Sequence, residues 1–178
     1  MKIRSYQPAD LETLKTITVE AFQGVSIDEG IEREYGPING HDWKWRKAGH
    51  VEADVRRDPE GIFIADVDGK IAGYISTWHD LEAGIGYIPN LAFAPEFRGQ
   101  GMGRKLLEHA LQHFRDLNLT LAKIETLEQN DVGNHLYTSL GFKEIVKQVH
   151  FVAPLTSTTE NHRTRLTDSG LRFSFFLK

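Results

Sequence analysis

The sequence predicts an α/β (α+β) fold, in which strands and helices alternate along the chain, and two observations carry this prediction. Residues 89–117 are typical of a buried strand, a glycine-rich loop and an amphipathic helix, in that order. Residues 62–67 and 70–75 are apolar runs on either side of Asp68-Gly69, which is the strongest short-range signal for a β-hairpin.

The N-terminal part begins with a predicted strand over residues 2–6, and Pro8 then suits the start of a helix. An apolar stripe at helical spacing indicates that helix, and it consists of Leu11, Leu14, Ile17, Ala21 and Phe22. Residues 24–40 are the least regular part of the sequence, because glycines and a proline interrupt an acidic stretch. A second helix is expected over residues 43–57, and Asp58-Pro59 ends it.

The strand expected over residues 86–94 contains Pro89, which lacks the N–H group that a central strand needs. We therefore expect a β-bulge at Pro89. Further strands are expected over residues 120–126, 142–152 and 171–177, with a short helix over 130–140 and a polar loop over 154–168. The whole chain then holds about seven strands.

The glycine-rich loop predicts an anion-binding site. Gly99, Gly101 and Gly103 lead into the helix, and Arg98 and Arg104 flank them. The first N–H groups of a helix have no internal partner, and glycine lets the backbone approach a phosphate closely. A Walker A loop does not fit, since Arg104 stands where Gly-Lys-Ser/Thr should begin, and in a G-x-G-x-x-G fingerprint the third glycine would come one residue later.

Composition narrows the class of protein. The 178 residues form a single domain by length, and 40% hydrophobic and 26% charged residues are ordinary for a soluble globular chain. No apolar run is long enough to span a bilayer, so we expect a cytoplasmic protein with no membrane partner. The absence of cysteine excludes disulfides and a cysteinyl acyl-enzyme. A net charge of −4 argues against a nucleic-acid partner.

The glycine loop resembles the pyrophosphate loop of the GNAT family of acyl-CoA-dependent N-acetyltransferases, whose signature is Arg/Gln-x-x-Gly-x-Gly/Ala. Here the signature is Arg98-Gly99-Gln100-Gly101-Met102-Gly103. A second stretch is similar to the family's Asn-x-x-Ala-x-x-Leu-Tyr-x-x-x-Gly-Phe motif. It begins at Asn130, has Gly133 where alanine is commoner, and continues through Tyr137 to Phe142.

The resemblance covers essentially all of residues 1–178 as a single acetyltransferase domain. It implies the GNAT fold, a mixed and mostly antiparallel sheet of about seven strands with a splayed central pair and flanking helices. It also implies acetyl-CoA as co-substrate, an amine acceptor and no metal. The residues that would bind the coenzyme are Leu91, Ala92, Phe93, Arg98, Gly99, Gln100, Gly101, Met102, Gly103, Arg104 and Asn130.

The implied reaction is direct attack of an amine on the thioester. An amine of pKa near 10 must first lose a proton, which costs roughly 4 kcal/mol at pH 7. A backbone N–H of residues 91–93 can stabilise the oxyanion, and the resemblance directs the Tyr137 hydroxyl at the sulfur.

Tyr137 and Glu125 are therefore the candidate catalytic residues. Glu125 stands at the offset from Asn130 at which ribosomal-protein N-terminal acetyltransferases place their catalytic glutamate. A structural or solvent-facing Glu125 is an equal alternative, and the rival bases are Glu82, Asp80 and His79.

Other candidate sites have weaker support in the sequence. His109 and His113 stand four residues apart on a helix, but no third metal ligand follows at a recognisable spacing, so packing or surface roles are expected. Trp43, Trp45 and the acids of residues 28–34 are candidates to line the acceptor pocket, since acids attract a cationic amine, and a solvated loop is an equal alternative.

The sequence leaves the acceptor open among a protein N-terminus, lysine, polyamine, aminoglycoside and amino acid. A non-catalytic acyl-CoA-binding or sensor module is the alternative function, and a homodimer is left open.

Overall fold

The computed structural model describes residues 1–155 of the chain. By internal contacts the chain divides into two units, residues 1–147 and residues 148–178, and all helices and strands given below belong to the first. Within the described part of the chain, no helix is both long and apolar enough to cross a membrane.

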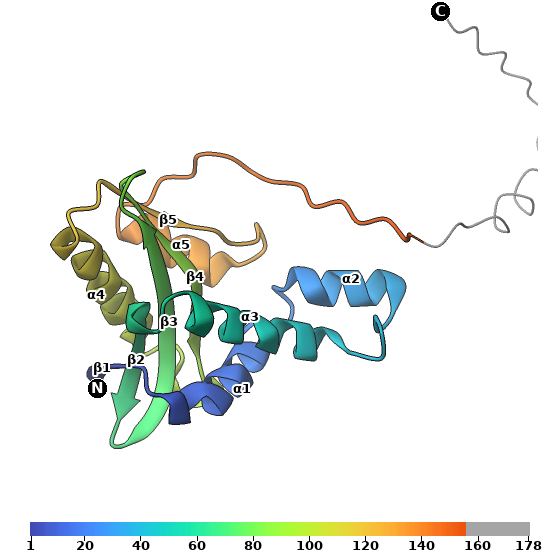
Figure 1. The fold of residues 1–178 in the computed structure, drawn as a ribbon, viewed down its shortest axis with the longest axis horizontal. Coiled ribbons are helices and arrows are strands. Elements are labelled where there is room, and N and C mark those ends of the chain that lie inside the picture. The colour runs from blue at the N-terminus through green and yellow to red at the C-terminus, as the bar shows by residue number, and fades with distance from the viewer. Residues whose placement is uncertain (156–178) are drawn as a thin grey trace, which may run out of the picture. The chain divides into compact units, whose positions relative to one another are not determined.

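A five-stranded sheet forms the centre of the first unit (Figure 1). Its strands lie in chain order: β1 (Lys2–Ser5), β2 (Ile62–Val67), β3 (Lys70–Asp80), β4 (Ile85–Phe93) and β5 (Leu121–Ile124). All neighbours pair antiparallel except β4 and β5, which pair parallel. The predicted mixed, mostly antiparallel α/β fold and its Asp68-Gly69 hairpin are confirmed.

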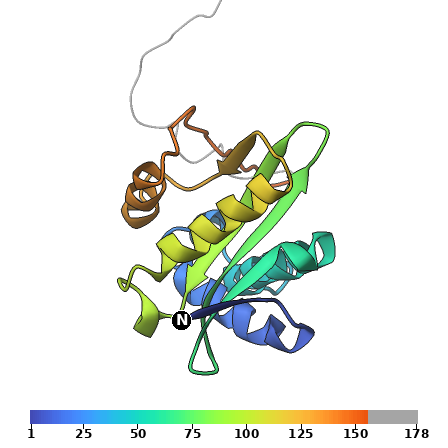
Figure 2. The same cartoon turned by 90° about the vertical axis from the view of Figure 1, so that its left-hand side faces the viewer.

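The helices cover both faces of this sheet. They are α1 (Leu11–Ala21), α2 (Ile27–Tyr35), α3 (Trp43–Arg57), α4 (Met102–Asp116) and α5 (Asp131–Ser139). Figures 1 and 2 show α4 on one face of the sheet and α1 and α3 on the other. The first face buries Phe63, Ile75 and Phe114 in its core, and the second buries Leu14, Val51 and Tyr74.

The predicted bulge lies where the sequence indicated it. Ser76 pairs with Asn90 and Trp78 pairs with Tyr87, so two residues of β4, Ile88 and Pro89, face a single residue of β3. Pairing of β4 with β5 runs only as far as Ile88 and Ile124. Beyond the bulge, β4 therefore has a free edge on the β5 side within the described residues, which is the parting of the central pair that the family resemblance implied.

Two parts of the sequence prediction were wrong. Residues 27–35 form helix α2 inside the stretch expected to be irregular, because Arg46 of α3 holds it through Asp28 and Glu32, at 3.5 and 3.7 Å. Gly36, at φ 75°, ends this helix rather than interrupting one.

Residues 142–152 form no strand within the described structure, so the sheet has five strands there instead of about seven. Ile145, Val149 and Phe151 are 86%, 72% and 92% exposed, because β-branched and aromatic residues form a strand only where a sheet edge pairs with them. The strand expected over residues 171–177 and most of the loop over 154–168 lie outside the described residues.

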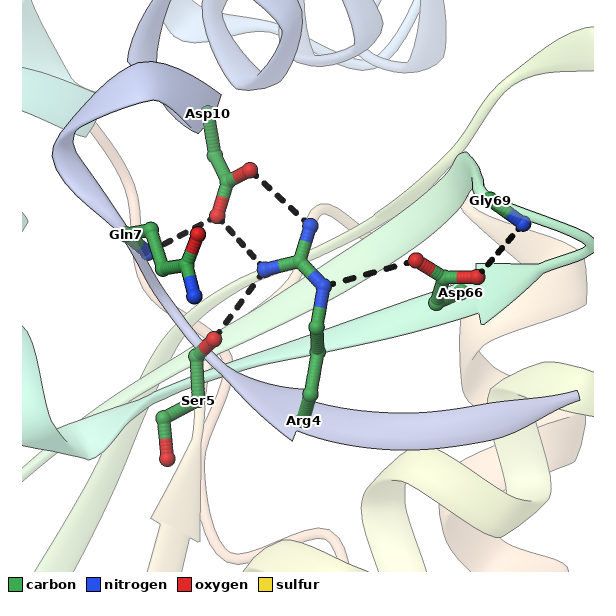
Figure 3. Close-up of polar contacts among 6 residues, drawn as sticks. All are labelled: Arg4, Ser5, Gln7, Asp10, Asp66 and Gly69. Carbon is green, nitrogen blue, oxygen red and sulfur yellow. Dashed lines mark hydrogen bonds and ion pairs between the residues drawn. The ribbon is translucent and has the colours of Figure 1, made fainter.

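An ion-pair network ties the N-terminus to the sheet (Figure 3). Arg4 of β1 donates to both carboxylate oxygens of Asp10, at 2.8 and 2.9 Å, and its Nε reaches Asp66 Oδ2 of β2 at 3.4 Å. The hydrogen bond from Arg4 lowers the pKa of the Asp10 carboxyl below its usual value. Asp10 also accepts the backbone N–H of Gln7 at 2.8 Å, so this buried carboxylate fixes the start of α1.

Candidate active site

The free edge of β4 presents backbone groups beyond the bulge. The Ala94 N–H donates to the Ala72 carbonyl oxygen on β3 at 2.9 Å. Hydrogen-bonding direction alternates along an antiparallel strand, so the N–H groups of Leu91 and Phe93 point away from β3, toward the free edge. Ala92 is buried against the α1 and α3 core, whereas Leu91 and Phe93 pack on the α4 side. The strand thus offers two backbone donors at one edge.

The glycine loop follows directly and is open. Gly99 and Gly101 have φ of 73° and 74°, a region that favours glycine, and no atom lies within 4 Å of the Cβ that either would carry. The N–H groups of Gly99, Gln100 and Gly101 have no hydrogen-bond partner among residues 1–155. Helix α4 then begins at Met102 and adds the unpaired N–H groups of its first turn. This array suits a phosphate group.

Side chains around the loop hold its shape. Arg98 Nε donates to the Phe93 carbonyl oxygen at 3.0 Å, and Gln100 Nε2 donates to the Glu96 carbonyl oxygen at 2.9 Å. Arg104 donates to Ser139 Oγ of α5 at 2.7 Å. Met102 is buried and anchors the start of α4.

Gly103 lies where the three predicted elements meet. A Cβ there would stand 3.5 Å from Leu136 of α5 and 3.7 Å from the Phe93 ring of β4. The structure therefore brings the helix of the second motif, which is distant in sequence, against the strand and the glycine loop.

Asn130 caps α5 in this structure. Its Oδ1 accepts the Gly133 N–H at 3.1 Å and its Nδ2 donates to Thr126 Oγ1 at 2.8 Å. A Cβ on Gly133 would stand 2.5 Å from Asn130 Nδ2, so the glycine that departs from the family motif is what leaves room for this capping arrangement.

Tyr137 lies on α5 and is partly buried against the core under α4. Its ring centroid is 6.2 Å from that of Phe142, and burial raises the pKa of its hydroxyl. The hydroxyl has no hydrogen-bond partner within the described residues. It is thus a protonated donor at neutral pH.

Glu125 follows the last residue of β5, beyond the point where β4 and β5 part. Its side chain is 71% exposed, and Oε1 accepts an ion pair from Lys123 Nζ at 2.6 Å. The hydrogen bond with Glu125 raises the pKa of Lys123. Its role as a base stays a prediction.

The rival bases lie at the other end of β4. Asp80 ends β3 and Glu82 lies in the β3–β4 turn, and Asp80 Oδ1 accepts the Ala83 N–H of that turn at 2.9 Å. His79 Nδ1 faces Asp58 at 3.7 Å.

The sequence did not predict a polar cluster that joins α3 to the bulge. Lys47 Nζ donates to Asn90 Oδ1 at 3.1 Å, and Asn90 Nδ2 donates to Asp54 Oδ2 at 2.7 Å. The same carboxylate oxygen accepts Ser76 Oγ at 2.6 Å. The signal was the run of polar residues at positions 47, 50, 54 and 57, which share one face of a helix.

A pocket of about 230 Å³ opens above this cluster. It is lined by Lys47, His50, Ala53, Asp54 and Arg57 of α3 and by two residues of β4, Pro89 of the bulge and the adjacent Asn90. A larger hollow of about 550 Å³ lies between α1 and the segment after β4, and three of its lining residues are glutamates. The smaller pocket contains the bulge itself, and the larger one contains none of the bulge residues.

The remaining candidates have structural surroundings. His109 and His113 lie edge-on to Phe63, at 4.5 and 5.1 Å between ring centroids. Trp43 is buried and Trp45 is 60% exposed, stacked on His41. Across residues 1–155, no group of three acidic, histidine or cysteine side chains could hold a metal ion.

Comparison with known proteins agrees with this geometry. The chain matches the acetyltransferase (GNAT) family over residues 25–142. The chain belongs to the GNAT family. It is therefore an acyltransferase by family.

Relatives of this GNAT chain are similar at modest identity. An uncharacterized N-acetyltransferase of Archaeoglobus fulgidus is 28% identical over 144 residues, which cover 78% of this chain and 90% of that protein. Mycothiol acetyltransferase of Thermobifida fusca is 38% identical over 96 residues, 48% of this chain. The match spans only 29% of the length of that second relative.

The GNAT fold is also shared with solved structures. PaiA N-acetyltransferase of Thermoplasma acidophilum, solved in complex with coenzyme A, has a TM-score of 0.64 with this chain and is 23% identical. The likeness covers 80% of this chain and 89% of that one. At 23% identity this likeness shows a shared fold and nothing more.

Proposed function

We propose that this GNAT chain transfers the acetyl group of acetyl-CoA directly to an amine. The observation that carries the proposal is the junction of β4 and α4, where two backbone donors on a free strand edge are followed by a glycine loop of unpaired N–H groups. A relative in fold was solved with coenzyme A, which supports the same ligand class here.

The residues fit an acyl-CoA that lies along this edge. The loop residues 99–103 and the first turn of α4 would bind the pyrophosphate, with Arg98 and Arg104 beside them. Residues 91–93 would bind the pantetheine arm, and the Leu91 or Phe93 N–H would stabilise the oxyanion. Asn130 would contribute through the remaining lone pair of Oδ1 or the second N–H of Nδ2, without leaving its cap.

Tyr137 and Glu125 complete the proposed chemistry. The Tyr137 hydroxyl would donate to the sulfur as the thiolate leaves, and Glu125 would accept the amine proton, directly or through water. The chain would act as a single domain of residues 1–178 in the cytoplasm.

Isothermal titration with acetyl-CoA, followed by thiol release against a panel of amines, tests this function. We expect saturable binding and acceptor-dependent release of coenzyme A. The exposure of Glu125 favours a second candidate, a non-catalytic acyl-CoA sensor. Tight binding without thiol release for any amine would select the sensor, and no binding would remove both candidates.

A further inference from the structure

The pocket at the bulge is lined by two cationic side chains, the buried Lys47 and the exposed Arg57. Lys47 is 7% exposed, and its Nζ lies 3.7 Å from the centroid of the Phe22 ring. Its hydrogen-bond partner is the neutral amide of Asn90. Arg57 lies over the Trp78 ring, with Cζ 4.4 Å from the centroid. In the described part of the chain, neither cation has a carboxylate oxygen within 4.0 Å.

Neighbouring cations on the same helix are paired. Arg46 lies 3.5 Å from Asp28, and Arg56 lies 3.8 Å from Glu52. Burial lowers the pKa of Lys47 to about 8, because the charges of Asp28 and Asp54, which raise it, only partly offset the cost of placing this ammonium away from water. An anion in the pocket would offset that cost.

The acidic member of the pocket is held in place. Asp54 Oδ2 accepts two hydrogen bonds, from Ser76 and Asn90, whereas its Oδ1 has no hydrogen-bond partner within residues 1–155. A carboxylate oxygen fixed in this way is an acceptor for an ammonium or amine N–H. The pocket therefore offers a negative group beside two positive ones.

The volume of the pocket limits the size of a ligand that can contact both the two cations and the Asp54 carboxylate. The volume of about 230 Å³ is below the range typical of drug-sized ligand sites, roughly 300–1,000 Å³. Its wall includes Pro89 and Asn90, which precede the exposed backbone edge of β4 by one or two residues. An acceptor here would reach the acyl group from the α3 face of the sheet.

We propose that this pocket is the acceptor subsite, and that the acceptor is a small amine bearing an anionic group, a carboxylate or a phosphate. Lys47 and Arg57 would bind the anion, and Asp54 would orient the amine. This inference rests on the proposed acetyl transfer. In that reaction the amine nitrogen bonds to the acetyl carbon as the carbon–sulfur bond breaks, and the departing thiolate gains the proton that the amine loses.

The test compares matched acceptors and matched arginines. Alanine is paired with alaninamide, and aminoethyl phosphate with ethanolamine, with thiol release as the readout. For the wild-type chain we expect kcat/KM to be at least tenfold higher for the member of one pair that bears the anionic group, which also identifies the anion. Arg57→Gln should lower kcat/KM at least tenfold for that member, through KM, and clearly less for its partner without the anionic group.

Arg56→Gln is the control, since Arg56 is 71% exposed and does not line the pocket. Arg56→Gln should leave the ratio of kcat/KM between the two acceptors of each pair unchanged. Lys47→Met, checked for folding by thermal unfolding, should also abolish the preference. Equal kcat/KM for acceptors with and without the anionic group, or an equal loss for both on Arg57→Gln, would overturn the inference while the acetyl transfer stands. Absence of thiol release with every amine would overturn the proposed function and this inference together.

Discussion

At the scale of single residues, Tyr137→Phe removes one oxygen from a partly buried ring. We expect kcat to fall about ten- to a thousandfold with little change in the KM for acetyl-CoA, because the donor acts as charge builds on sulfur. Steady-state kinetics measure both constants, and circular dichroism controls for the fold. A kcat within twofold of the wild type would leave Tyr137 with a packing role against Phe142.

Glu125 has a matched control in the same segment. Glu125 and Glu128 are 71% and 76% exposed, and each forms an ion pair with a lysine. Glu125→Gln should lower kcat/KM for the amine tenfold or more near pH 7, and the loss should shrink at pH 9 as free amine becomes abundant. Glu128→Gln should leave kcat/KM for the amine unchanged both near pH 7 and at pH 9. A flat pH response for Glu125→Gln would exclude it as the base.

Local patterns and distant contacts differ in how far the sequence revealed them. The motif around Asn130 and Tyr137 was visible because its residues follow one another, although the cap that Asn130 makes with Gly133 was not expected. Lys47, Asp54 and Asn90 were missed, since their hydrogen bonds join residues 36 and 43 positions apart. Such a cluster can be recognised only once the packing of α3 against β4 is known.

At the scale of elements, the glycine loop is tested by Gly101→Glu with Gly101→Ala as its control. Both variants bear the strain of a left-handed backbone at φ 74°, about 1–2 kcal/mol, but only glutamate brings a carboxylate to the N–H array. We expect Gly101→Glu to abolish acetyl-CoA binding in titration, with a normal circular dichroism spectrum. Gly101→Ala should retain measurable binding. Equal affinity for acetyl-CoA in both variants would show that the pyrophosphate does not bind at this loop.

Element prediction succeeded where a local signal was strong. The Asp68-Gly69 hairpin, the bulge at Pro89 and the helix over residues 43–57 form as the sequence indicated. Helix α2 was missed because Gly30 was interpreted as a breaker, whereas its helix is held by Arg46 from outside. The strand over 142–152 was expected from the local sequence, which cannot supply a pairing edge.

At the scale of the folded unit, the Arg4–Asp10 pair should make stability depend on pH. The folded-state pKa of Asp10 lies below its unfolded value, so its stabilisation is present above about pH 4 and is lost as pH falls toward the folded pKa. Asp10→Asn should lower stability at pH 7 by about 1.5–3 kcal/mol, a Tm drop of roughly 3–12 °C. Once the pH falls below the folded-state pKa of Asp10, the stabilities of the two proteins should converge.

The control is Glu12→Gln, which removes an ion pair with Lys15 whose acidic side chain is 79% exposed. Surface pairs contribute little, so its Tm should stay near that of the wild type at both pH values. A pH-independent gap between Asp10→Asn and the wild type would show that the side chain acts only by shape.

The stacking of Trp78 has an optical consequence. Its ring lies 3.8 Å from that of Tyr87, so Arg57, at 4.4 Å, must cover the opposite face. The other two tryptophans are on α3, one buried and one stacked on His41. An indole held against a guanidinium is sensitive to the movement of that charge. Any ligand that draws Arg57 aside should change the emission of Trp78, so the chain carries an intrinsic fluorophore for its pocket.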